Sequence, residues 1–347
     1  MISYAYYTDK TLKLQERSLP TLQGGDALIR VKACSICGTD VRTYRFGSSK
    51  IDDGRVIGHE VVGEIIELSD GIRGDFHTGD YVAVAPAIGC GVCYSCKSGH
   101  TNMCDDLKTI GYQYDGGFAE YMAIPAQAFK MGNVYKLPDV PDYTIYTLSE
   151  PLACAVNAQS YLHISERDDV VIFGSGIIGC MHAELALHGG ARNVFIIEPS
   201  EERIREAKGL LRKVRFIHPG ETDAVEQIRT MTDGKGADVA IIACSVGQAQ
   251  TDGMNLLAKR GRLSLFGGLP GESGGFIDSN LIHYREISVY GVHASTPDQN
   301  RQAMSMIFRG EIGVEKYITK RYGLNDIEQA FIDINGGKVM KAIIVNR

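Results

Sequence analysis

The spacing of hydrophobic residues changes near residue 150, and this change divides the chain into two parts with different predicted structures. In residues 1–150, apolar residues alternate with polar ones or form short runs between Gly, Pro and Asp, as in segments 27–34, 59–68 and 80–86. Such patterns are typical of β-strands. Few segments in this part keep a helical period, so it is predicted to be mostly β.

Beyond residue 150 the pattern alternates between helices and apolar strands. Helices are predicted at 153–163, 177–190 and 200–211, and strands at 168–174, 193–199, 213–219, 236–244, 261–268 and 287–292. This alternation is typical of a parallel sheet with crossover helices.

The predicted secondary structure changes again in the last part of the chain. After residue 296, two helices (299–310 and 324–336) and a final strand (339–346) are predicted to return to the first domain. We therefore expect a first domain made of residues 1–150 and 296–347, with a second domain, residues 151–295, inserted in it.

Composition and charge exclude several classes of partner. The 347 residues carry a formal net charge of −6, and 44% of them are hydrophobic, an ordinary globular balance. Lys and Arg form no run, so nucleic acid and anionic membranes are not expected partners, and no apolar stretch is long enough to span a bilayer. Nine cysteines, an odd number, and the lack of a hydrophobic N-terminal segment favour a reducing cytoplasm.

Four cysteines stand close together in residues 87–104, AIGCGVCYSCKSGHTNMC: Cys90, Cys93, Cys96 and Cys104. Four thiolates satisfy the tetrahedral preference of zinc and leave no position for water, so the lobe 89–105 is predicted to hold a structural zinc ion. An iron–sulfur cluster also takes closely spaced cysteines, but its usual spacings differ from this one. A disulfide pair would need an oxidising compartment.

A second group of candidate metal ligands lies outside this lobe. Cys37 and His59 offer a thiolate and an imidazole, and Glu60 and Glu150 offer carboxylates. Three protein ligands with an open position are the pattern of a catalytic zinc site, at which an alcohol loses its proton more easily and hydride can pass to nicotinamide. The remaining cysteines fall in apolar segments and are expected in the core: Cys34, Cys154, Cys180 and Cys244.

A glycine-rich motif follows the strand predicted at 168–174 and opens the next helix. It consists of Gly174, Gly176, Ile177, Ile178 and Gly179, and the acidic Glu198 ends the following strand. The glycines let the backbone approach a pyrophosphate, which the helix N-terminus attracts. A carboxylate at Glu198 can accept hydrogen bonds from both ribose hydroxyls of NAD and would repel the phosphate of NADP. Arg203 either packs on the adenine or is a solvated helix residue. The alternative interpretation of the motif is a glycine turn that binds no ligand.

With these residues assembled, the chain resembles the zinc-dependent medium-chain alcohol and polyol dehydrogenases over nearly its whole length. It is most similar to the branch of the sorbitol, butanediol, threonine and polyol-phosphate dehydrogenases. The resemblance is carried by the four-cysteine lobe and by CGTD at 37–40, GHEVVGEI at 58–65, GDYVAV at 79–84, GGFAEY at 116–121, SEPLACAVNA at 149–158 and GSGIIG at 174–179. It implies an α/β protein with a GroES-like, mostly-β catalytic domain and a Rossmann-type, doubly wound parallel sheet.

The resemblance also implies roles for single residues. Cys37, His59 and Glu60 would coordinate the catalytic zinc. Glu150 would be the fourth ligand or the partner of the zinc-bound water, and the two carboxylates can exchange. Thr39 would take the substrate proton.

Two further residues near Cys37 also follow from the resemblance. Asp40 would orient His59. Arg42 stands where the family usually has the histidine that ends the proton relay, and a guanidinium is not a base at neutral pH. The relay would then exit through the cofactor ribose and water, or Arg42 binds an anionic part of the substrate. A solvated arginine without substrate contact is the third interpretation.

These observations predict an NAD- and zinc-dependent enzyme that oxidises a secondary alcohol, a polyol or a sugar-alcohol phosphate, to the ketone. A threonine 3-dehydrogenase or a butanediol dehydrogenase is the alternative, although SEPLACAVNA differs from the Asp and Phe context frequent in the threonine branch. A zinc-ribbon module would need a more basic lobe than KSGHTNMCDDLK, and a zinc-free reductase would not need Cys37, His59 and Glu150. The resemblance further implies a homodimer or homotetramer.

Overall fold

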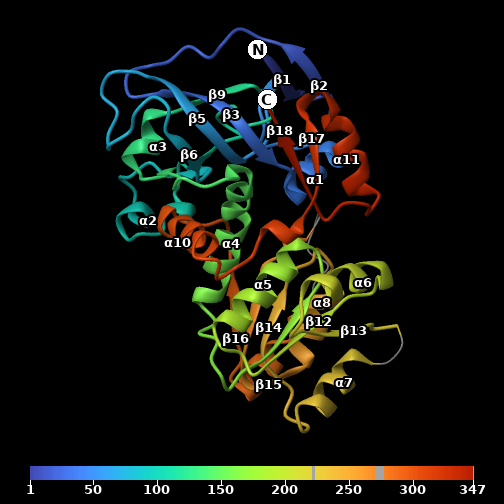
Figure 1. Cartoon of the computed structure of the whole chain (residues 1–347). Coiled ribbons are helices and arrows are strands. Elements are labelled where there is room, and N and C mark those ends of the chain that lie inside the picture. Colours follow the sequence, from blue (N-terminus) through green and yellow to red (C-terminus); the bar gives the residue numbers. More distant parts are fainter. Residues whose placement is uncertain (221–222, 270–276, 347) are drawn as a thin grey trace. The chain divides into compact units, whose positions relative to one another are not determined.

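The computed structural model describes residues 1–220, 223–269 and 277–346, and the chain folds into two compact units (Figure 1). Unit 1 comprises Met1–Ala153 and Ala294–Arg347, and unit 2 comprises Cys154–His293. The chain therefore leaves unit 1, forms unit 2 and then returns. The sequence pattern predicts the two domain boundaries after residues 150 and 295. Among the described residues, no helix has both the length and the apolar character needed to cross a membrane.

Unit 1 is built around one branched sheet. Its strands run in the order β10–β6–β5–β3–β18–β17, and β9 also pairs with β3. β3 (Ala27–Ser35) pairs antiparallel with β5 (Glu60–Leu68) and with β18 (Lys341–Val345), so the last strand of the chain lies beside an early one. The other strands of the unit are β1 (Ile2–Tyr6), β2 (Leu12–Glu16), β4 (Arg55–Val56), β6 (Tyr81–Val84), β7 (Ala87–Ile88), β8 (Lys108–Thr109), β9 (Tyr121–Ile124), β10 (Val134–Lys136) and β17 (Ile318–Gly323).

Short helices interrupt the mostly-β residues 1–150, and the hydrophobic pattern does not predict them, whereas it does predict the two helices of the C-terminal segment. The α1 helix (Gly38–Phe46) has little apolar character, and its buried residues are Asp40 and Thr43. It begins at Cys37, whose backbone N–H donates to Asp40 Oδ2 at 2.9 Å, so a local cap rather than a hydrophobic face defines its start. The other helices of the unit are α2 (Tyr94–Lys97), α3 (Ala126–Lys130), α10 (Pro297–Phe308) and α11 (Ile327–Asn335), with 3₁₀ turns at Thr101–Met103, Tyr143–Leu148, Glu315–Tyr317 and Leu324–Asp326.

The returning C-terminal segment is anchored in the core of unit 1 by an aromatic residue. Phe331 of α11 is completely buried. Its ring stacks on Tyr44 with 5.0 Å between centroids and on Tyr4 with 6.0 Å, and it meets Phe118 edge-on at 6.1 Å. These three partners all come from the first 120 residues, so the two sequence segments of the unit share one core.

Unit 2 is a parallel sheet with helices between its strands. The strand order β13–β12–β11–β14–β15–β16 corresponds to 3-2-1-4-5-6, the order of a Rossmann fold, which confirms the predicted doubly wound sheet. The strands are β11 (Asp169–Phe173), β12 (Asn193–Ile197), β13 (Arg215–Ile217), β14 (Ala237–Ile242), β15 (Leu257–Leu265) and β16 (Ser288–Gly291). The helices are α5 (Ile177–His188), α6 (Glu201–Leu210), α7 (Ala224–Met231), α8 (Gly247–Asn255) and α9 (Ser279–Arg285), and α4 (Ser149–Ser160) spans the unit boundary.

Gly179 allows α5 to pack directly against the loop that follows β11. A Cβ atom added at residue 179 would lie 1.9 Å from the carbonyl oxygen of Gly174. Backbone cannot move aside as a flexible side chain can, so only glycine fits at this position.

Replacement of Gly179 by Ala is expected to destabilise unit 2 by about 3 kcal/mol or more, because the clash forces the loop and helix apart. Gly209→Ala is the matched control, since Gly209 also lies in a helix and its added Cβ meets no atom within 4 Å. That control should be neutral or slightly stabilising. Urea and thermal unfolding would measure both variants, and equal stabilities would contradict the packing argument.

Candidate functional site

Strand ends at one edge of the unit 1 sheet bring three candidate metal ligands together. Cys37 follows the end of β3, His59 precedes β5, and Glu60 begins β5, opposite Ser35 in the antiparallel register. The ligand atoms of Cys37, His59 and Glu60 all lie within 4.8 Å of one another. Residues distant in the sequence thus form one group that a single ion can bridge.

Asp40 orders both the start of α1 and the imidazole of His59. Its Oδ2 accepts the hydrogen bond from Cys37, and its Oδ1 lies 3.5 Å from His59 Nδ1, longer than an ordinary hydrogen bond. Because Nδ1 faces Asp40, Nε2 is the ring nitrogen left for a metal. Burial lowers the pKa of His59, but the negative charges of Asp40 and Cys37 outweigh burial and raise it well above its ordinary value. The group therefore attracts positive charge.

The two oxygens of Glu60, a completely buried residue, have different surroundings. Oε2 accepts hydrogen bonds from the Ser35 hydroxyl and from Lys341 Nζ, the latter at 2.5 Å. Oε1 is buried and has no hydrogen-bond partner within the described part of the chain. A buried carboxylate oxygen is costly unless it is paired or coordinates a metal. This unpaired oxygen, in a group with a thiol and an imidazole, fits a metal ion.

Thr39 and Glu150 take different places relative to the group of three. Thr39 Oγ1 lies 3.7 Å from Cys37 Sγ. Glu150 is half-buried in the first turn of α4 and is not one of the three clustered ligands. It nevertheless acts on the same region: burial disfavours the charge of Lys341, but Glu60, Cys37 and Glu150 together raise the pKa of that lysine.

Arg42 lies on the exposed side of α1. Its charge acts on Tyr112, a half-buried residue whose pKa burial raises to about 12. The Tyr112 ring in turn lies 6.3 Å from the His59 ring, measured between centroids. Arg42 is therefore near the group of three ligands, but the structure shows no direct contact with them among the described residues.

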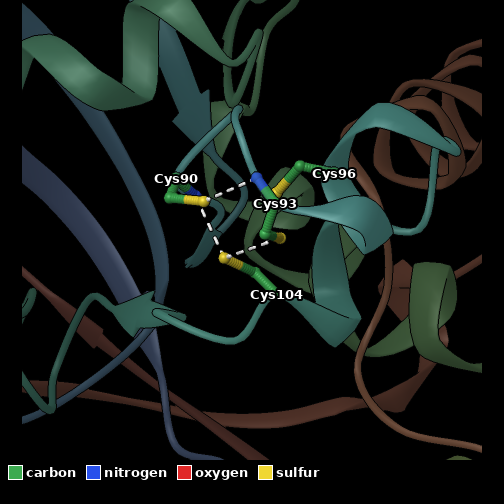
Figure 2. A group of neighbouring side chains, drawn as sticks. All are labelled: Cys90, Cys93, Cys96 and Cys104. Carbon is green, nitrogen blue, oxygen red and sulfur yellow. Dashed lines mark hydrogen bonds between the residues drawn. The ribbon is translucent and has the colours of Figure 1, made fainter.

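The four cysteines of the second group converge on one point of the lobe (Figure 2). All four sulfur atoms lie within 4.8 Å of one another, and Cys93 Sγ lies 3.8 Å from Cys104 Sγ. Tetrahedral zinc with bonds of about 2.3 Å holds its sulfur ligands about 3.8 Å apart. The Cys90 N–H donates to Cys104 Sγ at 3.1 Å, which favours a negative sulfur. The lobe therefore fits a closed zinc site.

The same lobe resists carrying four thiolates by itself. Backbone N–H groups of Cys96 and Asp105 lower the pKa of Cys93 to about 6, whereas burial raises the pKa of Cys96 to about 12. Metal ligands must be deprotonated, so a cation that enters has to displace protons from the lobe. A divalent ion would compensate the resulting negative charge.

The glycine motif of unit 2 lies at the carboxyl end of β11, where the strand order reverses between β11 and β14. Gly174 has a positive φ of 101°, and Gly176 is the exposed N-cap of α5. A Cβ at Gly176 would meet no atom within 4 Å, so there is room for a ligand at this helix N-terminus. Ile177 and Ile178 form the half-buried first turn of the helix.

Glu198 is buried at the end of β12 and holds the glycine loop. Its Oε2 accepts hydrogen bonds from the Ser175 N–H at 2.9 Å and the Ser175 hydroxyl at 3.1 Å, and its Oε1 accepts from the Ser200 N–H at 3.0 Å. A carboxylate offers about four acceptor positions, so these three hydrogen bonds do not fill all of them. The backbone N–H of the exposed Arg203 donates to Ser200 Oγ and so joins this residue to the arrangement.

Sequence reasoning did not identify Ser35, Lys341 or Ser175. Ser35 and Lys341 hold Glu60 from strands that are distant in the sequence, and Ser175 lies within the glycine motif and donates to Glu198. The one available signal was Lys341 itself, a single charge in the apolar final strand MKAIIV. A lysine at such a position has to find a partner if it is buried.

The chain matches two protein-family models: Alcohol dehydrogenase GroES-like domain over residues 23–139, and Zinc-binding dehydrogenase over residues 178–309. The L-threonine 3-dehydrogenase of Pyrococcus furiosus is 35% identical over 344 residues, which cover 96% of this chain and 94% of that protein. The sorbitol dehydrogenase of Halalkalibacterium halodurans is 31% identical over 334 residues, which cover 95% of this chain and 94% of that protein.

A solved structure extends this similarity to the fold. A zinc-binding dehydrogenase from Sinorhizobium meliloti 1021, bound to NADP, superposes with a TM-score of 0.91 at 26% identity and covers 99% of each chain. The predicted combination of a GroES-like domain with a Rossmann-type sheet is confirmed, as is the prediction of a zinc- and nicotinamide-dependent oxidoreductase. The chain belongs to the zinc-dependent medium-chain alcohol dehydrogenase family.

Proposed function

We propose that this chain oxidises a secondary alcohol of a polyol or a sugar-alcohol phosphate to the ketone, with NAD as the hydride acceptor. The observation that carries the proposal is the meeting of Cys37, His59 and the unpaired Oε1 of Glu60. Three such ligands leave one position of tetrahedral zinc open, whereas the four-cysteine lobe leaves none. We assign the catalytic zinc to the first group, with Glu150 as the alternative carboxylate, and the structural zinc to the lobe.

The residues around this group position the substrate and receive its proton. Zinc held there supplies a Lewis acid that favours loss of the hydroxyl proton, and NAD supplies the acceptor for hydride. Thr39, with its hydroxyl 3.7 Å from Cys37 Sγ, is the first group of the proton relay: it accepts that proton while it passes its own hydroxyl proton on through the cofactor ribose to water. Asp40 keeps the His59 ring in the orientation that leaves Nε2 for the metal.

One other substrate class has support from a relative. The name of the Pyrococcus relative favours L-threonine, whereas that of the Halalkalibacterium relative agrees with the proposed polyol. A panel of polyols, polyol phosphates, a vicinal butanediol and L-threonine, assayed for NADH formation, separates these classes. Highest kcat/KM on a polyol or its phosphate is the expected result, and highest kcat/KM on L-threonine would replace the proposal.

We also propose that the protein works in a reducing cytoplasm as a homodimer or homotetramer. All nine cysteines are free thiols in the structure, as expected where disulfides do not form. Light scattering of the purified protein would measure the number of chains in the assembly.

The two zinc sites are expected to differ in how readily they lose their zinc ion to a chelator. Purified protein should contain two zinc ions per chain, and mild chelation should remove one, because the open site offers fewer protein ligands. Cys37→Ser should contain about one zinc but still bind NADH, since the glycine loop lies in the other unit. The matched control is Cys34→Ala, a buried cysteine within β3. Elemental analysis would contradict the proposal if the wild type held one ion that left together with the fold.

Glu198 is expected to select NAD over NADP by repelling the additional phosphate. Glu198→Gln removes the charge but keeps an amide oxygen for the loop, so it should raise kcat/KM with NADP about tenfold or more at a modest cost with NAD.

The control for this experiment is Glu202→Gln on the exposed face of α6, which should not change the cofactor ratio. Equal wild-type efficiency with NAD and NADP would argue against the role of Glu198.

The effect of replacing Arg42 on KM is expected to depend on the charge of the substrate. If it binds an anion, Arg42→Ala should raise KM for phosphorylated polyols about tenfold and leave KM for neutral diols unchanged, because neutral diols offer no anion to the guanidinium. Arg45→Ala is the matched control, as Arg45 is also exposed on α1. Steady-state kinetics in which uncharged polyols are preferred and Arg42→Ala is silent would identify Arg42 as a solvated residue.

A further inference from the structure

Lys341 is a buried cation whose place is set by the register of three strands. It begins β18, in which Ile343 lies opposite Ser35 of β3, and Ser35 lies opposite Glu60 of β5. The Lys341 side chain is 3% exposed and that of Glu60 is 0% exposed. Buried lysines are rare unless they are paired. The pairing of Lys341 is therefore a specific feature of this edge of the sheet.

The contacts of Lys341 are directed at one oxygen of Glu60. Its Nζ donates to Glu60 Oε2 at 2.5 Å and to the carbonyl oxygen of Ile36 at 2.9 Å. The Ser35 hydroxyl donates to the same Oε2. Two donors thus fix the carboxylate from one side, while Oε1 stays without a hydrogen-bond partner in the described part of the chain.

We propose that Lys341 is a positioning residue for the metal: by holding Oε2, it presents Oε1 to the group formed with Cys37 and His59. Without the ammonium group, one of the two donors on Oε2 is lost and the carboxylate can turn away from that group. Partners that orient metal ligands in this way commonly contribute to metal affinity. The inference rests on the zinc site proposed above and adds a residue that does not itself coordinate the ion.

A second lysine provides a matched comparison. Lys320 lies on β17, the neighbour of β18, and its Nζ binds Asp333 Oδ2 at 3.0 Å. Asp333 also accepts hydrogen bonds from Tyr322 and Gln329 and is not a member of either candidate metal group. Lys320 therefore makes a lysine–carboxylate ion pair that is more exposed than that of Lys341 and has no connection to the metal ligands.

The test is the zinc dissociation constant of the exchangeable site, measured on the full-length protein by competition with a colorimetric chelator. Lys341→Met should raise this constant about 10–100-fold, and Lys320→Met should leave it unchanged. A purely structural role for Lys341 would lower the unfolding temperature but would not change the zinc constant. An unchanged constant in folded Lys341→Met would therefore overturn the proposal.

A double-mutant cycle tests whether Lys341 acts through Glu60. In a Glu60→Gln background, Lys341→Met should have little further effect on the zinc constant, because the carboxylate that it positions is gone. The same large effect in both backgrounds would overturn the proposal. If Lys341→Met does not fold, Ser35→Ala decides, since it removes the other donor to Oε2 without leaving a charge unpaired; it should raise the constant about threefold or more, and an unchanged constant would overturn the proposal.

The failure of this inference can be told apart from failure of the zinc site itself. If Cys37→Ser keeps the zinc content of the wild type, the proposed catalytic site is wrong and the role of Lys341 falls with it. If Cys37→Ser loses one zinc ion while the zinc constant of Lys341→Met stays that of the wild type, the site stands and only the positioning role is wrong.

Discussion

The antiparallel pairing of β3 with β5 and β18 is the constraint on which the candidate site depends. Side chains alternate between the two faces of a strand, so a slip of one residue would turn each of them to the other face. The β3–β5 register is irregular between Val31 and Ala33, and after that point Ala33, Cys34 and Ser35 pair with Val62, Val61 and Glu60. A bulge here sets the last pairs of the ladder. It thereby fixes which residue meets Glu60 at the strand end.

The electrostatics of the two metal groups follow from their surroundings. In the cysteine lobe, backbone N–H groups stabilise the sulfurs: the N–H of Cys90 donates to Cys104 Sγ, and the N–H of Cys93 donates to Cys90 Sγ. The group at Cys37 instead gathers side-chain charges, with Asp40 behind His59 and Lys341 behind Glu60. Breaking a buried ion pair by removing one partner typically costs about 3–5 kcal/mol. The Lys341–Glu60 ion pair thus couples the stability of this end of the sheet to the position of the metal ligand Glu60.

The sequence predicts those features whose residues are close together or follow a period. The four cysteines and the glycine motif belong to this class, because their spacing alone places them on one loop. The α1 helix was missed, since it starts at a polar cap and lacks a hydrophobic face. Lys341 and Ser35 were missed for another reason: their contact with Glu60 depends on strand register, which no local pattern specifies. Glu198 was predicted as a ribose acceptor, but its hydrogen bonds to Ser175 became visible only in the folded loop.

The return of the C-terminal segment to unit 1 has a consequence for how the protein is made. A ribosome releases residues 87–104 early, so the cysteine lobe has all four sulfurs available while most of the chain is still unmade. β18 and Phe331 emerge only after the whole of unit 2, and until then Ala33–Ser35 of β3 lack their β18 partners and Glu60 lacks its ammonium partner. Domains generally fold during synthesis from the N-terminus onward. This topology reverses that order for the candidate active site, which is completed only after unit 2 has been synthesised.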